Sequence, residues 1–382
     1  MADVRNYDLF IGGEWIPATT EERDTIRNPA TGDVLASVGI ASKDDVDRAL
    51  QGAQEAFGTW SRLIATDRAD YLYKLIELIR RDEDRLARLI TSENGKPIRE
   101  AKVEVNFAIQ LIRFAAENAR RLEGNIIPGS RPGEKILIEK IPHGVIAGIS
   151  AWNFPLALTA RKLGPALAAG NTFVIKPHEL TPLSTLALAE LSVEAGFPKG
   201  VFNVVTGGGV TVGNQLVTNP ITKLITMTGS TPAGRKIMAA ASEGLKEVRL
   251  ELGGKAPFIV MDDADIEAAA TAAVSARFMN CGQVCTANER TYVHQAVYDQ
   301  FLDLLRKKIA QIKVGNPLDA DTTMGPKISK AELEKVDAMV QRAIAQGAKV
   351  EIGGKALTGG IYDAGNFYAP TLLTNVTNEM DI

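Results

Sequence analysis

The chain has 382 residues, which exceeds one ordinary domain and predicts two or three. Hydrophobic residues make up 45% and charged residues 23%, the composition of a soluble globular protein. The formal net charge of −3 gives no electrostatic case for binding nucleic acid, and no apolar stretch reaches the roughly 20 residues that a membrane span needs.

The N-terminus and the sulfur content favour a reducing compartment. Met1-Ala2-Asp3-Val4-Arg5 lacks the apolar core of a secretory signal, so we expect a cytoplasmic protein. Two cysteines cannot staple a chain of this size, and we expect Cys281 to be a small buried residue. The three histidines lie far apart without the spacing of ligands, so we expect no metal site.

The first part of the chain predicts short strands and then amphipathic helices. Strands over 9–11 and 14–16 flank a Gly-Gly turn. Ser42 is placed to cap a helix with one apolar face. A longer helix is predicted from about Asp67 to Asn94, where Gly95 ends it.

Residues 124–142 look like an excursion from this pattern. Residues 134–140 mix charged side chains with branched apolar ones, as expected of an exposed strand or of one that pairs with another subunit. A strand that pairs with another subunit would make the chain a homo-oligomer, a dimer or a tetramer, whereas an exposed strand would not.

From Gly144 onward, short apolar runs alternate with helical stretches. This alternation predicts βαβ units and a parallel sheet, in an α/β fold. Ligands of such sheets bind beyond the carboxyl ends of the strands. The strands are predicted over 145–149, 172–175, 202–205, 223–227, 247–250 and 258–261, and the helices near 156–168, 183–194, 211 onward and 233–241.

Two motifs 34 positions apart suggest covalent catalysis. Cys285 lies in Gly282-Gln283-Val284-Cys285, and a thiol is well suited to attack a carbonyl group near neutral pH. Glu251 opens Glu251-Leu252-Gly253-Gly254-Lys255, and its carboxylate would activate the water that removes the covalent adduct. A helical spacing of four would place Cys281 and Cys285 on one face.

Asn153 follows the predicted strand 145–149 at the start of a helix. A side-chain amide on such a turn would donate to a developing oxyanion. The alternative is a helix cap, with Pro155 in the first helical turn.

Lys176-Pro177-His178-Glu179 ends the strand 172–175. A cation and a carboxylate three residues apart would bracket the hydroxyls of a ribose, and the carboxylate would repel a 2′-phosphate, which favours NAD over NADP. The alternative is a solvated turn with a surface ion pair.

Two glycine-containing turns also join a strand to a helix. Residues 207–213 would bring backbone N–H groups to a phosphate, although their spacing differs from G-x-G-x-x-G by one residue. Ser230, in the turn 228–234, would contact a pyrophosphate oxygen, cap the helix, or do both. An empty tight turn is an equal alternative for residues 207–213.

In this order and spacing, the motifs resemble those of the aldehyde dehydrogenase superfamily, from near the N-terminus to the last residue. The chain looks most like bacterial lactaldehyde/glycolaldehyde dehydrogenases, with succinate-semialdehyde dehydrogenases next. The resemblance is carried by Trp152-Asn153-Phe154-Pro155, Lys176-Pro177-His178-Glu179, Gly229-Ser230-Thr231, Glu251-Leu252-Gly253-Gly254-Lys255 and Gly282-Gln283-Val284-Cys285.

The resemblance implies NAD-dependent oxidation of an aldehyde. Cys285 would form a thiohemiacetal whose oxyanion Asn153 and the Cys285 N–H hold, hydride would pass to the nicotinamide, and Glu251 would activate water against the thioester. The implied cofactor contacts are Ile149, Ser150, Trp152, Lys176, Glu179, Gly209, Gly213, Gly229, Ser230 and Leu252.

The resemblance also implies a three-part subunit. Residues 1–123 and 143–253 would form the Rossmann-like NAD-binding domain, 124–142 the β excursion used in oligomerisation, and 254–382 the catalytic α/β domain. The family pattern continues past Ile382 into a Glu-x-Phe-Gly-Pro segment, so the catalytic domain is expected to be C-terminally incomplete in this chain.

The helix after Asn153 presents Phe154, Leu158 and Arg161 at spacings of four and three, on a face that lines the substrate tunnel in related enzymes. Arg161 stands where enzymes of hydrophobic aldehydes have an apolar or aromatic residue. We expect a small polar aldehyde, lactaldehyde or glycolaldehyde first and succinate semialdehyde second, unless Arg161 pairs with a carboxylate of the protein.

Two competing functions remain at this point. A CoA-acylating semialdehyde dehydrogenase would not need Glu251 as a base. A truncated, non-catalytic family member would fit the missing segment but not the intact Cys285, Glu251 and Asn153.

Overall fold

The computed structural model describes residues 5–382, which form two compact units. The first comprises the chain up to Ile26, Ala36–Leu86 and Val103–Glu251, and the second comprises Arg27–Leu35, Ala87–Lys102 and Leu252–Ile382. Residues 27–35 and 87–102 thus cluster with the C-terminal part of the chain, whereas the predicted division placed them in the NAD-binding domain. The functional roles of the domains stay a prediction.

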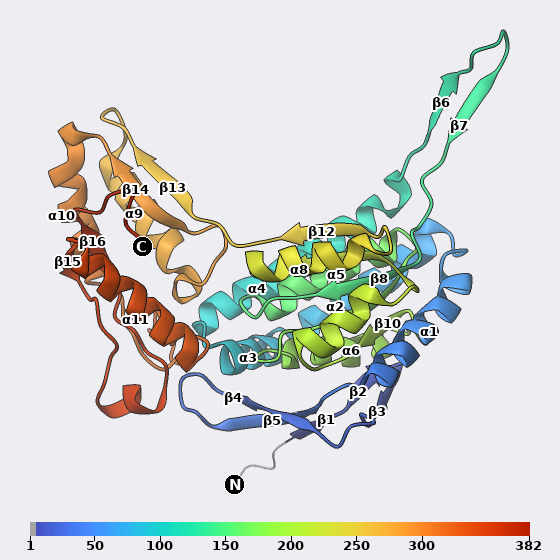
Figure 1. Ribbon diagram of the computed structural model, residues 1–382, viewed down its shortest axis with the longest axis horizontal. Helices are drawn as coiled ribbons and strands as arrows, with labels where there is room; N and C mark the ends of the chain where they lie inside the picture. The colour runs from blue at the N-terminus through green and yellow to red at the C-terminus, as the bar shows by residue number, and fades with distance from the viewer. Residues whose placement is uncertain (1–4) are drawn as a thin grey trace. The chain divides into compact units, whose positions relative to one another are not determined.

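A seven-stranded sheet forms the centre of the first unit (Figure 1). The strands from β8 to β12 run parallel, as predicted from the alternation of strands and helices, and the β2–β3 hairpin adds an antiparallel edge. Their order is β12 (Glu247–Glu251), β11 (Thr222–Thr228), β8 (Val145–Ile149), β9 (Thr172–Lys176), β10 (Phe202–Val204), β2 (Leu9–Ile11) and β3 (Glu14–Ile16).

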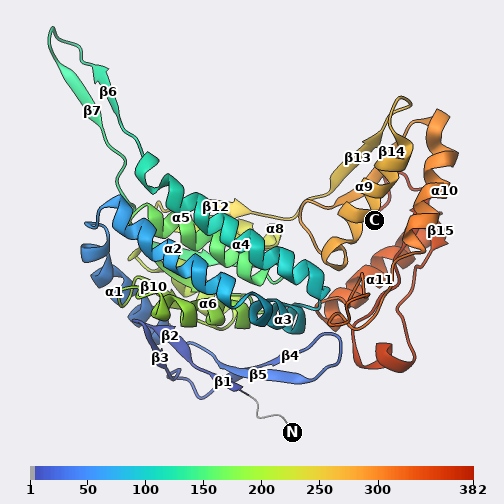
Figure 2. The ribbon, with the colours of Figure 1, turned by 180° about the vertical axis from the view of Figure 1, so that it is seen from behind.

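Helices cover both faces of this sheet (Figure 2). α1 (Lys43–Trp60) and α7 (Asn214–Thr218) pack on one face, in a core that includes Leu50, Val145 and Val174. α5 (Pro155–Ala168) and α6 (Leu183–Glu194) pack on the other face, and α2 (Ala65–Arg81) lies against them. Both faces of the central strands are therefore buried, as a parallel sheet requires.

Local signals explain where α1 begins. Ser42 and Asp45 form a reciprocal capping box, so two N–H groups that would lack partners at the helix start are satisfied. The predicted capping by Ser42 is confirmed.

The prediction of one long helix from Asp67 to Asn94 is wrong. The helix stops at Arg81 and a second helix, α3 (Glu83–Asn94), starts after Asp82, whose backbone is not helical (φ −99°, ψ 16°). The Asp82 carboxylate lies at the break and pairs with Arg81 on one side and Arg85 on the other. The apolar periodicity continues across the break, which is why the pattern alone does not show it.

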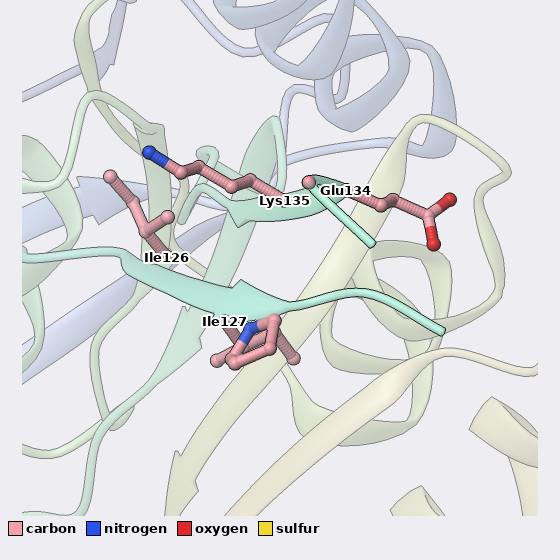
Figure 3. A pocket seen from close by; sticks show the side chains of 6 residues that line it. Ile126, Ile127, Glu134 and Lys135 are labelled. Carbon is pink, nitrogen blue, oxygen red and sulfur yellow. The ribbon is translucent and has the colours of Figure 1, made fainter. Parts of the chain in front are cut away.

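The excursion forms a two-stranded antiparallel hairpin, β6 (Asn125–Pro128) and β7 (Lys135–Ile138), in which every residue is exposed. A shallow hollow of about 260 Å³ lies beside the hairpin. Of the residues that line it, Glu134 and Lys135 point away from each other (Figure 3). The exposed isoleucines of the hairpin agree with the expected exposed strand. The role of the hairpin in oligomerisation stays a prediction.

The remaining elements complete the two units. In the second unit, Phe301 of α10 (Tyr298–Ile309) packs in an apolar core with α9 (Ile266–Phe278).

No helix within residues 5–382 is long and apolar enough to cross a membrane. The elements are β1 (Arg5–Tyr7), β4 (Arg23–Arg27), β5 (Val34–Gly39), α4 (Ile98–Asn118), α8 (Thr231–Ser242), β13 (Ala256–Val260), α9 (Ile266–Phe278), β14 (Asn288–Val293), α10 (Tyr298–Ile309), α11 (Lys330–Ala345), β15 (Lys349–Ile352) and β16 (Leu372–Thr374).

Candidate active site

The carboxyl edge of the parallel sheet gathers residues that the sequence singles out. Ile149 at the end of β8 lies opposite Lys176 on β9 and opposite Met227 on β11, and Thr228 lies opposite Glu251 on β12. Four adjacent strands therefore end at the same edge of the sheet. This is the edge at which α/β sheets bind their ligands.

The same edge has the features that a dinucleotide requires. Ser150 is buried, yet its hydroxyl makes no hydrogen bond with the described residues, so it is available to a ligand. A Cβ on Gly213 would lie 3.9 Å from Lys176 and 4.0 Å from Ile149, whereas one on Gly209 would meet nothing within 4 Å. The two glycines thus leave room beside the strand ends for a bound cofactor.

Lys176 is buried, and it pairs with Glu179, whose side chain is partly exposed. The Lys176 ammonium donates to Glu179 Oε1 at 3.2 Å and to the Gly207 carbonyl at 2.9 Å, and only 3% of the residue is exposed. Burial lowers the pKa of Lys176 against the opposing charge of Glu179. Burial also acts to raise the pKa of Glu179, but the charges of Lys176 and His178 outweigh it and hold that pKa below its usual value. The Lys176 ammonium is therefore withdrawn from solvent, whereas the carboxylate of Glu179 is partly exposed, which differs from a fully solvated surface ion pair.

Ser230 caps α8, as one of its two predicted roles requires. Its Oγ accepts the N–H of Ala233 at 3.3 Å, and the N–H of Gly229 donates to the Glu251 carbonyl at 3.0 Å. These bonds join the loop after β11 to the end of β12. A pyrophosphate contact by Gly229 or Ser230 stays a prediction.

Glu104 supports the first turn of α5, which follows Asn153, and no local sequence pattern predicts this contact. Its buried Oε1 accepts the N–H groups of Leu156 and Ala157 at 3.0 and 3.2 Å, in the first turn of α5. Phe154 occupies the cap position and makes no side-chain cap bond, so the capping alternative for Asn153 finds no support there.

Lys162 is a further residue that the sequence analysis missed. The residue is buried, and its ammonium donates to Thr228 Oγ1 at 2.7 Å. Burial and, to a lesser degree, the charge of Arg161 lower the pKa of Lys162, the charge of Glu251 opposes them, and the net pKa is about 8. At a pH near 8, Lys162 is therefore about half protonated, and its charge interacts with that of Glu251, the predicted base.

Lys162 makes stability depend on pH in the alkaline range. Its pKa is about 8 in the folded chain against 10.5 in the unfolded chain, so unfolding takes up a proton between these values and the folded state gains stability as pH rises through this window. From pH 7 to 10.5 the wild type should gain on the order of 3 kcal/mol in unfolding free energy relative to Lys162→Met. Urea melts at several pH values measure this, and parallel curves for the two proteins would contradict it.

The three residues of the predicted substrate face differ in exposure. Leu158 is buried, Phe154 is partly exposed and Arg161 is exposed. No carboxylate within residues 5–382 lies at ion-pair distance from Arg161, so the alternative of an internal partner finds no support.

Cys285 lies at an exposed turn of the second unit. The N–H of Ala287 donates to the Val284 carbonyl at 3.1 Å and closes the turn. A Cβ on Gly254 would come within 2.8 Å of the Cys285 carbonyl oxygen, so only glycine allows this approach. Cys281 is buried, as predicted, and burial raises the pKa of its thiol to about 12. The two cysteines do not share a helical face, because α9 ends at Phe278.

The described residues offer no cluster of three or more His, Cys, Asp or Glu side chains that would hold a metal ion. Among the described residues, the exposed thiol of Cys285 and the carboxylate of Glu251 remain as the candidate reacting groups.

The comparison with known families decides what these features belong to. Residues 15–382 match the model of the aldehyde dehydrogenase family. The chain belongs to that family. The resemblance found in the sequence is confirmed, and so is the α/β fold, because solved aldehyde dehydrogenases superpose on it with TM-scores of 0.96.

Characterised relatives act on several aldehydes. A 3,6-anhydro-α-L-galactose dehydrogenase of Vibrio sp. (strain EJY3) is 47% identical and aligns over 99% of this chain and 79% of its own length. The lactaldehyde dehydrogenase of Escherichia coli is 45% identical over 98% of this chain and 78% of its own, and its solved structure has a TM-score of 0.96 at 44% identity, covering 99% and 79%. An NADP-dependent succinate-semialdehyde dehydrogenase of E. coli is 44% identical over 96% and 75%.

The relatives also differ in cofactor. The solved 3,6-anhydro-L-galactose dehydrogenase (47% identity, TM-score 0.96, covering 98% of this chain and 79% of its own) is a complex with NADP, whereas a betaine aldehyde dehydrogenase of Staphylococcus aureus is a complex with NAD. The chain is thus an enzyme that oxidises aldehydes with a nicotinamide cofactor.

Proposed function

We propose that the chain oxidises a small polar aldehyde of the lactaldehyde or glycolaldehyde type to its acid, with NAD as the cofactor. The observation that carries this proposal is that Ile149, Lys176, Thr228 and Glu251 end four strands at one edge of the sheet, next to Ser150. The hydroxyl of Ser150 is buried and has no hydrogen-bond partner among the described residues. Those groups fit a dinucleotide and place a carboxylate at the same edge.

The chain's own residues account for the covalent part of the reaction. The Cys285 thiolate attacks the aldehyde carbon, and the oxyanion of the thiohemiacetal accepts hydrogen bonds from Asn153 and the Cys285 N–H. The bound cofactor supplies a hydride acceptor. Glu251 then takes a proton from the water that attacks the thioester, which releases the acid and restores the thiol.

The preference for NAD rests on negative charge near the adenosine ribose. Glu179 is held ionised by Lys176 and His178, and burial together with the charge of Glu179 raises the pKa of Asp24. A 2′-phosphate would meet this charge. We expect kcat/KM for NAD to exceed kcat/KM for NADP by about tenfold or more. The Glu179→Gln substitution should reduce this NAD-to-NADP ratio. An equal or greater kcat/KM for NADP in the wild type would overturn the preference.

The substrate class rests on Arg161, an exposed cation for which the described part of the chain shows no carboxylate partner. We expect Arg161→Leu to lower kcat/KM for glycolaldehyde about tenfold relative to that for hexanal. A panel of lactaldehyde, glycolaldehyde, succinate semialdehyde and hexanal measures this. Unchanged relative activities would remove Arg161 from the argument.

Succinate semialdehyde is the second candidate, because the same guanidinium suits a carboxylate and because an E. coli relative acts on this aldehyde. The panel separates it from lactaldehyde by kcat/KM. CoA dependence of product formation would instead indicate acyl transfer to CoA.

We further propose that the exposed β6–β7 hairpin pairs with another copy of the chain in a dimer or tetramer. Light scattering, which measures the mass of the assembly, tests this proposal.

A further inference from the structure

The chain leading to Cys285 runs through three successive residues with positive φ. Asn280, Cys281 and Gly282 have φ angles of 50°, 57° and 77°. Glycine adopts this conformation freely, whereas a cysteine adopts it at a steric cost. This left-handed run ends three residues before Cys285, so its geometry sets where the turn bearing the thiol begins.

Two charged side chains from distant segments hold this run. Glu100, in the first turn of α4, accepts the N–H of Asn280 on Oε2 at 2.7 Å. The ammonium of Lys327 donates to the Cys281 carbonyl at 2.7 Å. The two bonds grip successive residues of the run, one at an N–H and the other at a carbonyl.

Weaker contacts complete the support around the same residues. The N–H of Gly325 donates to Cys281 Sγ at 3.2 Å, and the N–H of Ile328 donates to Gln283 Oε1 at 3.0 Å. Arg277 donates to the Gly282 carbonyl at 2.8 Å. Every residue from 280 to 283 is therefore tied by hydrogen bonds to its surroundings.

We propose that Glu100 and Lys327 are positioning residues, which hold the left-handed run 280–282 and thereby fix the Cys285 turn for attack on the aldehyde. Neither side chain touches the reacting atoms. Each acts on the backbone, and a displacement of about 1 Å in a reacting group is enough to cost 10²-fold in rate. The role rests on the proposed function of Cys285 as the nucleophile.

The test uses Glu100→Ala and Lys327→Met in the full chain. Both should lower kcat by 10- to 100-fold per titratable Cys285 thiol and leave KM for NAD within about threefold. Both should also speed amide hydrogen exchange in the peptide 278–288 while peptides of the first unit exchange as before. Glu100→Gln keeps an acceptor oxygen for the Asn280 N–H and should restore most of the rate.

Matched controls are Glu117→Ala, an exposed glutamate on the same helix, and Lys330→Met, an exposed lysine three residues after Lys327. Neither should change kcat or local exchange. Activity lost only in proportion to the reactive thiol, or exchange that rises throughout the molecule, would show a merely structural role and overturn the proposal. The exchange result does not depend on turnover, so faster local exchange in a chain without dehydrogenase activity would refute the proposed function and not the support of the run.

Discussion

Cys285→Ala is expected to lower aldehyde-dependent NADH formation by at least about 10⁴-fold, since removal of a catalytic nucleophile leaves only binding and electrostatic contributions. The thiol lies on an exposed turn and packs in no core, so the substitution should leave the melting temperature within a few degrees. Stopped-flow and steady-state absorbance at 340 nm measure the loss.

The neighbouring residue in the same turn supplies a matched control. Thr286 is also exposed, and Thr286→Ala should keep kcat within about threefold. Turnover by Cys285→Ala at a rate similar to that of the wild type would mean that the thiol is not the nucleophile, whatever the family.

Glu251→Gln is expected to separate hydride transfer from hydrolysis. Without a carboxylate base, the thioester should accumulate, so a burst of about one NADH per active chain precedes a steady rate reduced by 10²- to 10⁴-fold. Rapid mixing with glycolaldehyde and saturating NAD measures both phases.

The other end of the same strand provides the comparison for this variant. Glu247 is exposed and pairs with Arg249 at 2.8 Å, so Glu247→Gln should keep the wild-type steady rate. Loss of the burst together with the steady rate in Glu251→Gln would assign Glu251 to an earlier step than hydrolysis.

The strands and the sheet edge at which they end were predictable because their signals are local. Runs such as 145–149 and 172–176 are apolar, short and followed directly by polar motifs, and parallel pairing places Ile149 and Lys176 side by side. The helix cap at Ser42 likewise depends only on residues 42–45, which are adjacent in sequence. Adjacent residues therefore fix both the elements and the edge at which they meet.

Contacts between distant segments were not predictable in this way. Glu104 meets the first turn of α5 from 52 residues away, and Glu100 meets Asn280 from 180 residues away. Lys162 reads as an ordinary helical lysine until burial and Thr228 define its surroundings. The helix break at Asp82 is a local change in backbone angles that apolar periodicity does not encode. Sequence thus identified the proposed reacting groups and missed the groups that support them.

One measurement tests the central claim most directly: peptide mass mapping of the Glu251→Gln protein, quenched in acid during the burst with glycolaldehyde and NAD. The account predicts a glycolyl thioester on the peptide that contains Cys285, in an amount equal to the NADH formed. NADH formed in the burst without an adduct on Cys285 would contradict it.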